Sequence, residues 1–265
     1  MENIIRNIIE EELNGLIKNL KKCFYKRYKG KEHNFLLSKF ENKTKANMVF
    51  VSCFESQIGN RMENICRRIV ALKYNVPKTI PNIENNLKLQ RNKQYILTNI
   101  NQKDLHSQID RILSPDNKMN KNNVKKLLKL KIKKNKNIEK LVVDLAYYDE
   151  RNILNIFEIK SGGMLDSSKA KGDLTKLLEL YVSANDVNAN VYFATIYNFN
   201  GEGNNWDGNP ARFFEKDLLL IGKDFWNKIL PNEVNFEKFK KIYDDVFEKL
   251  EISNKMSILV NDVIK

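Results

Sequence analysis

Two short apolar segments separated by a polar turn constrain this chain more than any other feature; they lie between Leu141 and Lys160, in LVVDLAYYDERNILNIFEIK. The pattern predicts a β-hairpin. Because side chains two apart in a strand point to the same face, Glu158 and Lys160 are expected to share a face. Burying charged groups among valine, isoleucine and phenylalanine is unfavourable unless they are paired or used. We therefore predict that Asp144, Glu158 and Lys160 form a reaction centre; the alternative is an ion-pair cluster on an edge strand.

The chain is strongly basic, with a formal net charge of +13 over 265 residues. This charge favours a polyanionic partner, most simply nucleic acid. An anionic membrane surface is the alternative, but it requires a basic amphipathic helix with bulky aromatic side chains. The N-terminal segment MENIIRNIIEEEL carries glutamates and is not a signal peptide, and no apolar stretch reaches membrane-spanning length. We therefore expect no membrane association.

The three cysteines, Cys23, Cys53 and Cys66, lie in apolar helical patterns. We expect them to be buried, reduced thiols, which is typical of a cytoplasmic protein. The two histidines, His33 and His106, are isolated, and no CxxC pair occurs. Neither a zinc site nor histidine-dependent nucleophilic chemistry is predicted.

The hydrophobic periodicity predicts an α/β core with helical additions at both ends. Helices are expected at 3–27, 52–72, part of 121–140, 167–184, 223–230 and 235–250, with a further short helix at the C-terminus. Strands are expected at 94–98, on both sides of the hairpin turn at 148–152, at 190–198 and at 217–221. The stretches 42–51 and 99–123 are expected to be irregular, with a turn at Ser114-Pro115-Asp116. The Gly/Asn-rich segment 198–210 is expected to be a long loop, and such loops are usually functional or mobile.

The two carboxylates of the hairpin suit a divalent cation. Mg²⁺ prefers oxygen ligands and keeps several waters, so one or two carboxylates plus substrate are enough to hold it. Asp144 and Glu158 can supply these ligands, together with the carbonyl of Ile159. Two carboxylates about 4 Å apart repel each other by about 4 kcal/mol at an effective dielectric constant of about 20. A bound cation removes this repulsion; Lys160 partly offsets it without metal, and can orient or help deprotonate the attacking water.

Asp144 followed by Glu158-Ile159-Lys160 at a hairpin spacing resembles the PD-(D/E)xK nuclease motif, with Val143 in place of the motif's proline. The literal Pro115-Asp116 pair is a worse match, because the downstream Glu139-Lys140 lacks the intervening residue. Three further segments resemble Type II restriction endonucleases, in particular the TdeIII-like group. They are SQIGNRMENI, EIKSGGMLDSSKAKGDLTKLLELY and LLLIGKDFW, and together they cover roughly residues 52–230.

The resemblance implies a restriction-endonuclease-like core, with a small mixed β-sheet flanked by helices and helical additions at both termini. We expect a single nuclease domain over 1–265, with its catalytic core at about 52–230 and helical extensions at 1–40 and 232–265. The resemblance also implies a DNA endonuclease that uses Mg²⁺, with Mn²⁺ as a substitute, and leaves 5′-phosphate and 3′-hydroxyl ends. Glu63 is implied as an accessory acid near the metal, although it could equally pair with Arg67 at i+4.

Five basic side chains are predicted to contact DNA, with an ordinary solvated surface as the alternative for each. Lys169 and Lys171 begin the helix that follows a Gly-Gly break, and Lys125 and Lys126 belong to the lysine-rich run before the hairpin. These lysines suit phosphate contacts. Arg212 follows the Gly/Asn loop, and arginine pairs with guanine.

The leading hypothesis is a Type II restriction endonuclease that cleaves both strands of double-stranded DNA at a short palindromic or pseudo-palindromic site. A homodimer is expected, because one active site per chain must cut two strands related by a dyad. A cognate DNA methyltransferase is expected as a genetic partner. The alternatives are a structure-selective or repair nuclease with the same core, and a non-catalytic basic DNA-binding protein.

Overall fold

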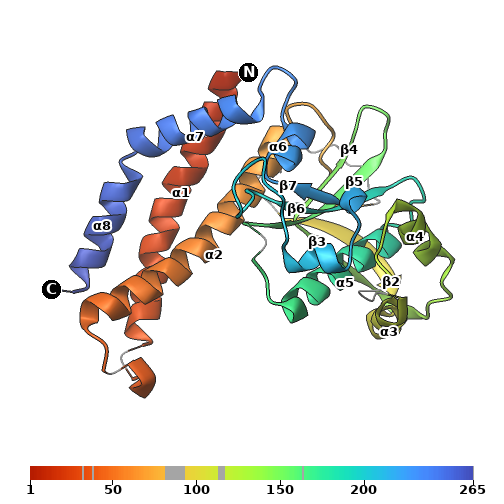
Figure 1. Ribbon diagram of the computed structural model, residues 1–265, viewed down its shortest axis with the longest axis horizontal. Coiled ribbons are helices and arrows are strands. Elements are labelled where there is room, and N and C mark those ends of the chain that lie inside the picture. The colour runs from red at the N-terminus through yellow and green to blue at the C-terminus, as the bar shows by residue number, and fades with distance from the viewer. Residues whose placement is uncertain (32, 38, 81–92, 113–116, 163, 265) are drawn as a thin grey trace. The chain divides into compact units, whose positions relative to one another are not determined.

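The computed structural model describes residues 1–31, 33–37, 39–80, 93–112, 117–162 and 164–264. The expected turn at Ser114-Pro115-Asp116 and the literal Pro115-Asp116 pair lie outside these described residues, as does the second glycine of the Gly-Gly break. The chain forms two compact units (Figure 1). We call Met1–Ile65 with Asn232–Lys265 the helical unit, and Cys66–Pro231 the α/β unit. That the chain acts as a single nuclease domain stays a prediction.

The helical unit contains the predicted N-terminal and C-terminal helices. Its elements are α1 (Glu2–Lys29), η1 (Phe35–Leu37), α2 (Asn42–Val70, which ends in the α/β unit), α7 (Phe236–Lys249) and α8 (Ile252–Asp262). Helix α1 contacts both α7 and α8, which lie alongside it in Figure 1. The contact buries a stripe of α1 at helical spacing that includes Ile5, Ile9, Leu13 and Leu16.

The expectation of irregular structure at 42–51 is wrong, because α2 begins at Asn42. Ala46, Val49 and Cys53 are buried at i, i+3 and i+7, so the apolar stripe of α2 already starts in this segment. Polar residues are frequent in 42–51, so the sequence does not show the helical period of these three buried residues clearly. None of the described helices is long and apolar enough to cross a membrane.

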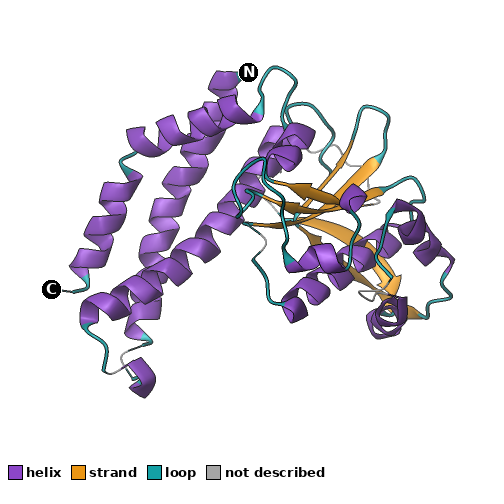
Figure 2. Ribbon diagram, viewed as in Figure 1, coloured by secondary structure: helices purple, strands orange, loops and turns teal. Residues whose placement is uncertain are grey.

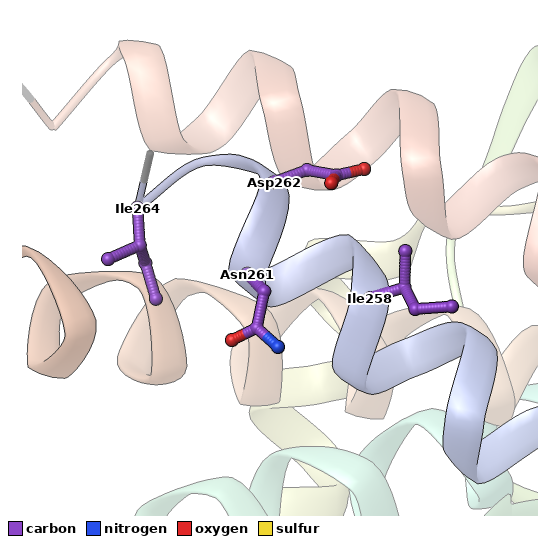
Figure 3. Close-up of a pocket in the computed structure, with 4 residues that line it drawn as sticks. All are labelled: Ile258, Asn261, Asp262 and Ile264. Atoms are coloured by element: carbon purple, nitrogen blue, oxygen red, sulfur yellow. The ribbon is translucent and has the colours of Figure 1, made fainter.

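A shallow pocket lies at the C-terminal end of α8, where Ile258, Asn261, Asp262 and Ile264 line it (Figure 3). Among the described residues its lining has a single carboxylate and two aliphatic side chains. These described side chains offer neither a charge pair nor a nucleophile, so we assign no chemistry to the pocket.

The α/β unit contains two small mixed sheets, which confirms the predicted α/β class and divides the expected single sheet in two (Figure 2). In the first sheet, β1 (Thr79–Ile80) runs parallel to β2 (Gln94–Ile100), and β2 runs antiparallel to β3 (Lys134–Val143). In the second sheet, β4 (Leu145–Tyr148) is antiparallel to β5 (Leu154–Lys160), followed in parallel by β6 (Asn190–Thr195) and β7 (Leu219–Ile221). The predicted hairpin is therefore confirmed as β4–β5. The helical elements are α3 (Gln102–Ile112), α4 (Lys121–Lys126), η3 (Leu127–Lys129), α5 (Ser167–Ala184), η4 (Asn209–Arg212), η5 (Lys216–Leu218) and α6 (Lys223–Ile229).

Helix α5 packs against both sheets, because it contacts β2 of the first sheet and β5 and β6 of the second. Its buried Leu174, Leu177 and Tyr181 share one apolar core with Ile96 of β2 and Ile156 of β5. On the opposite face of the second sheet, Phe157 of β5 is buried in contact with aromatic rings of neighbouring elements. Glu158 thus lies in a strand whose two faces are both packed, which restricts the freedom of its side chain.

Two other sequence-based expectations for this unit are wrong. The segment 99–123 is not irregular, since it contains α3, which buries only Leu105 and Ile109 one turn apart. Two apolar positions are too few to reveal a helix by periodicity. In 121–140 the predicted helix covers only α4 and η3, and the lysine-rich remainder is strand β3, whose pairing with β2 overrides its polar composition.

The Gly/Asn segment at 198–210 is the loop predicted, and its own asparagine side chains hold it together. Asn198 Nδ2 donates to the carbonyl of Asn204 at 2.8 Å, and Asn200 Nδ2 donates to Asp207 Oδ1 at 2.9 Å. Trp206 Nε1 donates to the carbonyl of Gly162 at 3.2 Å, which ties the loop to the end of the β4–β5 hairpin. A substituent on Gly162 would lie 2.5 Å from the ring of Tyr197, so the exposed Tyr197 side chain would have to move to admit one.

All three cysteines are reduced; Cys53 and Cys66 are buried as predicted, whereas Cys23 is half-buried. The Cys23 thiol donates to Cys53 Sγ at 3.1 Å. Burial, together with the adjacent Cys23 thiol, raises the pKa of Cys53 to about 11.

Because the reactive species is the thiolate, we predict that Cys53 of the native protein resists alkylation by iodoacetamide at pH 8, while Cys23 is modified first. Peptide mapping of the labelled protein would measure the rate at each cysteine. Unfolding in guanidinium should bring all three rates together. Labelling of native Cys53 as fast as of the unfolded chain would contradict the assignment.

Candidate active site

The site begins where one strand passes from the first sheet into the second. Strand β3 ends at Val143 and β4 begins at Leu145, so Asp144 alone occupies the change of direction. Val143 pairs with Gln94 of β2, whereas Leu145 pairs with Phe157 of β5. The backbone on each side of Asp144 is therefore held by a different sheet.

The side chain of Gln94 joins the two sheets at this point. Its amide is buried, with Oε1 accepting from the N–H of Ala146 at 2.9 Å and Nε2 donating to the carbonyl of Ala146 at 2.8 Å. Nε2 also donates to the carbonyl of Pro77 at 2.6 Å. The amide thus provides β4 with the pair of hydrogen bonds that a neighbouring strand would make.

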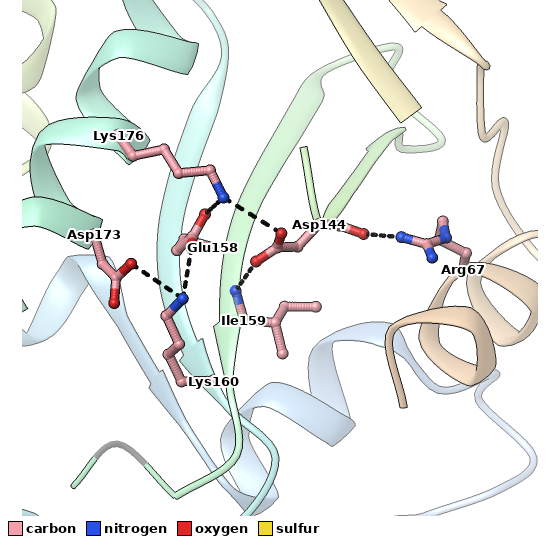
Figure 4. A network of polar contacts seen from close by, with 7 residues as sticks. All are labelled: Arg67, Asp144, Glu158, Ile159, Lys160, Asp173 and Lys176. Carbon is pink, nitrogen blue, oxygen red and sulfur yellow. Dashed lines mark hydrogen bonds and ion pairs between the residues drawn. The ribbon is translucent and has the colours of Figure 1, made fainter. Parts of the chain in front are cut away.

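Asp144 is oriented by hydrogen bonds to both its backbone and its carboxylate (Figure 4). The buried Arg67, near the end of α2, donates through Nη1 to the carbonyl of Asp144. The Asp144 carboxylate accepts from the backbone N–H of Ile159 through Oδ2 at 2.9 Å. Oδ1 therefore points away from the backbone of β5 and can meet a cation.

The predicted residues Asp144, Glu158 and Lys160 lie together. Glu158 and Lys160 share a face of β5, and Lys160 Nζ lies 2.9 Å from Glu158 Oε1. Two residues of α5 complete the cluster, as Figure 4 shows. Lys160 Nζ lies 3.1 Å from Asp173 Oδ1, and Lys176 Nζ lies 2.6 Å from Glu158 Oε2 and 3.5 Å from Asp144 Oδ1.

The sequence analysis missed Asp173 and Lys176. A signal for them exists in DLTKLLELY, where Asp173, Lys176, Leu177 and Leu180 follow the spacing i, i+3, i+4 and i+7 of one helix face. Charged residues in the middle of an otherwise apolar helix indicate that this part of α5 faces a polar site.

Burial dominates the electrostatics of Glu158, whose side chain is 0% exposed. Burial and the negative charge of Asp144 raise the pKa of Glu158 to about 7, against the opposing effect of Lys160 and Lys176. Burial by itself would lower the pKa of Lys160, but Glu158 and Asp173 outweigh it and raise that pKa. The pKa of Lys176 is likewise raised, because Asp144 and Glu158 outweigh its burial. Both ammonium groups are therefore charged at neutral pH.

The donor set fits Mg²⁺. Asp144 Oδ1 and Glu158 Oε2 already meet a single cation, the ammonium of Lys176. Backbone direction adds a third oxygen. The Lys160 carbonyl accepts from Ile196 on the β6 side, whereas the Ile159 N–H points to Asp144, so the Ile159 carbonyl also faces the Asp144 side. Among the described residues no group of three or more His, Cys, Asp or Glu side chains could hold a metal, so waters and substrate would complete the coordination, as Mg²⁺ prefers.

The remaining predicted site residues make none of the contacts of this cluster among the described residues, or they belong to the helical unit. Glu63 is on α2 in the helical unit, and its accessory role stays a prediction. Lys169 pairs with Asp166 at 3.2 Å, and Lys171 pairs with Asp110 at 2.9 Å.

Lys125 is exposed, Lys126 Nζ donates to Asn123 Oδ1 at 3.1 Å, and Arg212 Nη1 donates to Ser167 Oγ at 3.2 Å. Within the described part of the chain, these three and Lys169 and Lys171 make no hydrogen bond or ion pair with Asp144 or Glu158. Their contact with DNA stays a prediction.

A family model described as "Type II restriction endonuclease, HinfI" matches residues 1–247. The match includes the N-terminal helices as well as the α/β unit, whereas the resemblance found in the sequence covered only about 52–230. The finer expectation of a TdeIII-like member is not supported, because the matching family is a different one. Searches of curated proteins and of solved structures give no match.

We predict that Gln94→Leu destabilises the α/β unit, because it leaves the buried N–H and carbonyl of Ala146 without partners. The free energy of unfolding should fall by roughly 2–6 kcal/mol, because each of the two unsatisfied groups costs about 1–3 kcal/mol. Urea unfolding followed by circular dichroism would measure it. Gln102→Leu is the matched control, because Gln102 makes an exposed hydrogen bond to Glu139. Equal losses for the two variants would contradict the role given to Gln94.

Proposed function

Because the chain belongs to the HinfI family of Type II restriction endonucleases and is a site-specific deoxyribonuclease, we propose that it hydrolyses both strands of duplex DNA with Mg²⁺ at the Asp144–Glu158–Lys160 site. The observation that carries the proposal is the convergence of two buried carboxylates on one cation position, with a lysine two residues from one of them. Mn²⁺, which also accepts oxygen ligands, is proposed as a substitute.

Asp144 and Glu158 would hold the metal through Oδ1 and Oε2, and Ile159 would contribute its carbonyl. The bound ion would supply charge for the scissile phosphate and lower the pKa of the attacking water. Asp144 is prepared for this role, because the Ile159 N–H fixes its other oxygen. Glu63 is proposed as an accessory acid, on the basis of the family resemblance alone.

Lys160 would orient the attacking water and stabilise the negative charge that develops on the phosphate. Its ammonium lies between Glu158 and Asp173, at 2.9 and 3.1 Å, so its position is fixed from two sides. Since its pKa is raised, the group holds its proton and acts as a hydrogen-bond donor in preference to a base. We propose products with 5′-phosphate and 3′-hydroxyl ends.

Cleavage of two antiparallel strands at a short palindromic or pseudo-palindromic site requires two equivalent centres, so we propose a homodimer. Lys125, Lys126, Lys169 and Lys171 are proposed to contact phosphates and Arg212 to read a base. The net charge of +13 supports such contacts. A cognate methyltransferase is proposed as the genetic partner.

We predict that Glu158→Gln and Lys160→Gln each reduce cleavage by at least about 100-fold, as loss of a group that stabilises the transition state does. DNA affinity, measured with Ca²⁺ in place of Mg²⁺, should stay within about threefold, because the phosphate contacts that dominate affinity are unchanged. The substrate is a fully sequenced plasmid, and the ends of the fragments are mapped. Glu215→Gln and Lys216→Gln are the controls, because both side chains are exposed in the same unit.

The outcomes distinguish the competing functions. Discrete fragments that disappear in the two site variants support the proposal. A smear would indicate a non-specific nuclease, and a preference for branched over linear duplexes a structure-selective or repair nuclease. DNA binding without cleavage by the unmodified protein would indicate a non-catalytic DNA-binding protein.

A further inference from the structure

The ammonium of Lys176 lies at the position where the proposed metal would bind. Nζ is 2.6 Å from Glu158 Oε2 and 3.5 Å from Asp144 Oδ1, so it bridges the two carboxylates (Figure 4). Their side chains are 0% and 11% exposed, whereas the side chain of Lys176 is 38% exposed. The carboxylates are thus held inside the fold, and the lysine reaches them from its surface.

Lys176 and Lys160 have different partners. Lys160 Nζ contacts Asp173 as well as Glu158, so it keeps an acidic partner if Glu158 turns to a metal. Lys176 contacts Glu158 and Asp144, and it contacts no other acidic side chain among the described residues. It therefore places a positive charge between two neighbouring buried carboxylates.

An ammonium and a divalent cation compete for the carboxylate oxygens of Asp144 and Glu158. Both bind these oxygens, and their positive charges repel each other. The lysine side chain has a flexible four-carbon stem, so it can turn outward to solvent while the carboxylates stay in place. Once released, the ammonium lies at the rim of the site. A DNA phosphate near the carboxylates would be its natural partner there.

We propose that Lys176 is an internal cation that competes with the divalent metal and thereby couples metal binding to DNA binding. A DNA phosphate binds the released ammonium of Lys176. Because the ammonium has then left the carboxylates, the affinity of the site for the metal increases. By linkage, metal bound first favours DNA to the same extent. This inference rests on the metal site proposed above.

The test measures Ca²⁺ binding by isothermal titration calorimetry, with and without the duplex that the unmodified protein cleaves with Mg²⁺. Lys176→Met should bind Ca²⁺ about 5–150-fold more tightly than the unmodified protein without DNA, the usual range of a coupling between sites. The gain in Ca²⁺ affinity that DNA produces should be smaller in Lys176→Met by a similar factor. Lys176→Arg keeps the positive charge and should behave like the unmodified protein. Lys216→Met, which removes an exposed lysine from the same unit, should change neither affinity.

The melting temperature, measured by thermal denaturation with and without Ca²⁺, is a second readout. It can also be measured for variants of low stability. Without metal, Lys176→Met should melt at a lower temperature than the unmodified protein, because its carboxylates have lost their counter-charge. Ca²⁺ should then raise its melting temperature more than it raises that of the unmodified protein. If Lys176→Met does not fold even with Ca²⁺, the same comparison is made with Lys176→Gln.

A purely structural role for Lys176 would lower the melting temperature and leave Ca²⁺ affinity unchanged, which would overturn the inference. Weaker Ca²⁺ binding in Lys176→Met would overturn it as well. Asp144→Asn separates this failure from that of the proposed function. If Asp144→Asn abolishes Ca²⁺ binding while Lys176→Met does not change it, only the role of Lys176 is wrong. If Asp144→Asn binds Ca²⁺ normally, the metal site itself is wrong.

Discussion

The site depends on one continuous strand that changes sheets at Asp144. Because β3 pairs with β2 and β4 pairs with β5, the chain must leave its first partner at Val143 and reach its second at Leu145. Among the described strands, β4 pairs with β5 only as far as Phe157. The Asp144 carboxylate accepts the hydrogen bond of the Ile159 N–H, so a single departure from sheet pairing orients the first oxygen of the acidic cluster.

Local patterns were sufficient to predict the hairpin, helix α5 and the shared face of Glu158 and Lys160, because these depend on alternation and helical period within a few residues. The pattern failed where contacts distant in sequence decide the structure. Strand β3 is lysine-rich and forms because β2 lies beside it, and α3 has too few buried residues to show a period. Asp173 and Lys176 reach the site only because α5 packs across both sheets, which no local pattern contains.

Family membership and site geometry support the function from independent directions. The family match covers residues 1–247 and identifies a site-specific deoxyribonuclease without reference to the three-dimensional structure. The site geometry rests on the contacts among Asp144, Glu158, Lys160 and Lys176, and it supports the proposed role of each of these side chains. The two agree at the hairpin, where a basic chain that acts on DNA places two buried carboxylates within reach of two lysines.

The pairing of β2 with β3 also determines where this chain can tolerate a change in length. The register between β2 and β3 shifts between Thr98 and Ile100, so the pairing of Ile100 with Lys134 does not continue the register of the preceding pairs. An inserted or deleted residue on that side of the irregularity could be absorbed there. From Glu139 to Val143 the register with β2 is continuous, and a slip of one residue would turn an aliphatic neighbour of Asp144 toward Lys160 and Lys176. Along β3, related enzymes should therefore vary in length on the Lys134 side of this irregularity, and the spacing between Glu139 and Asp144 should stay constant.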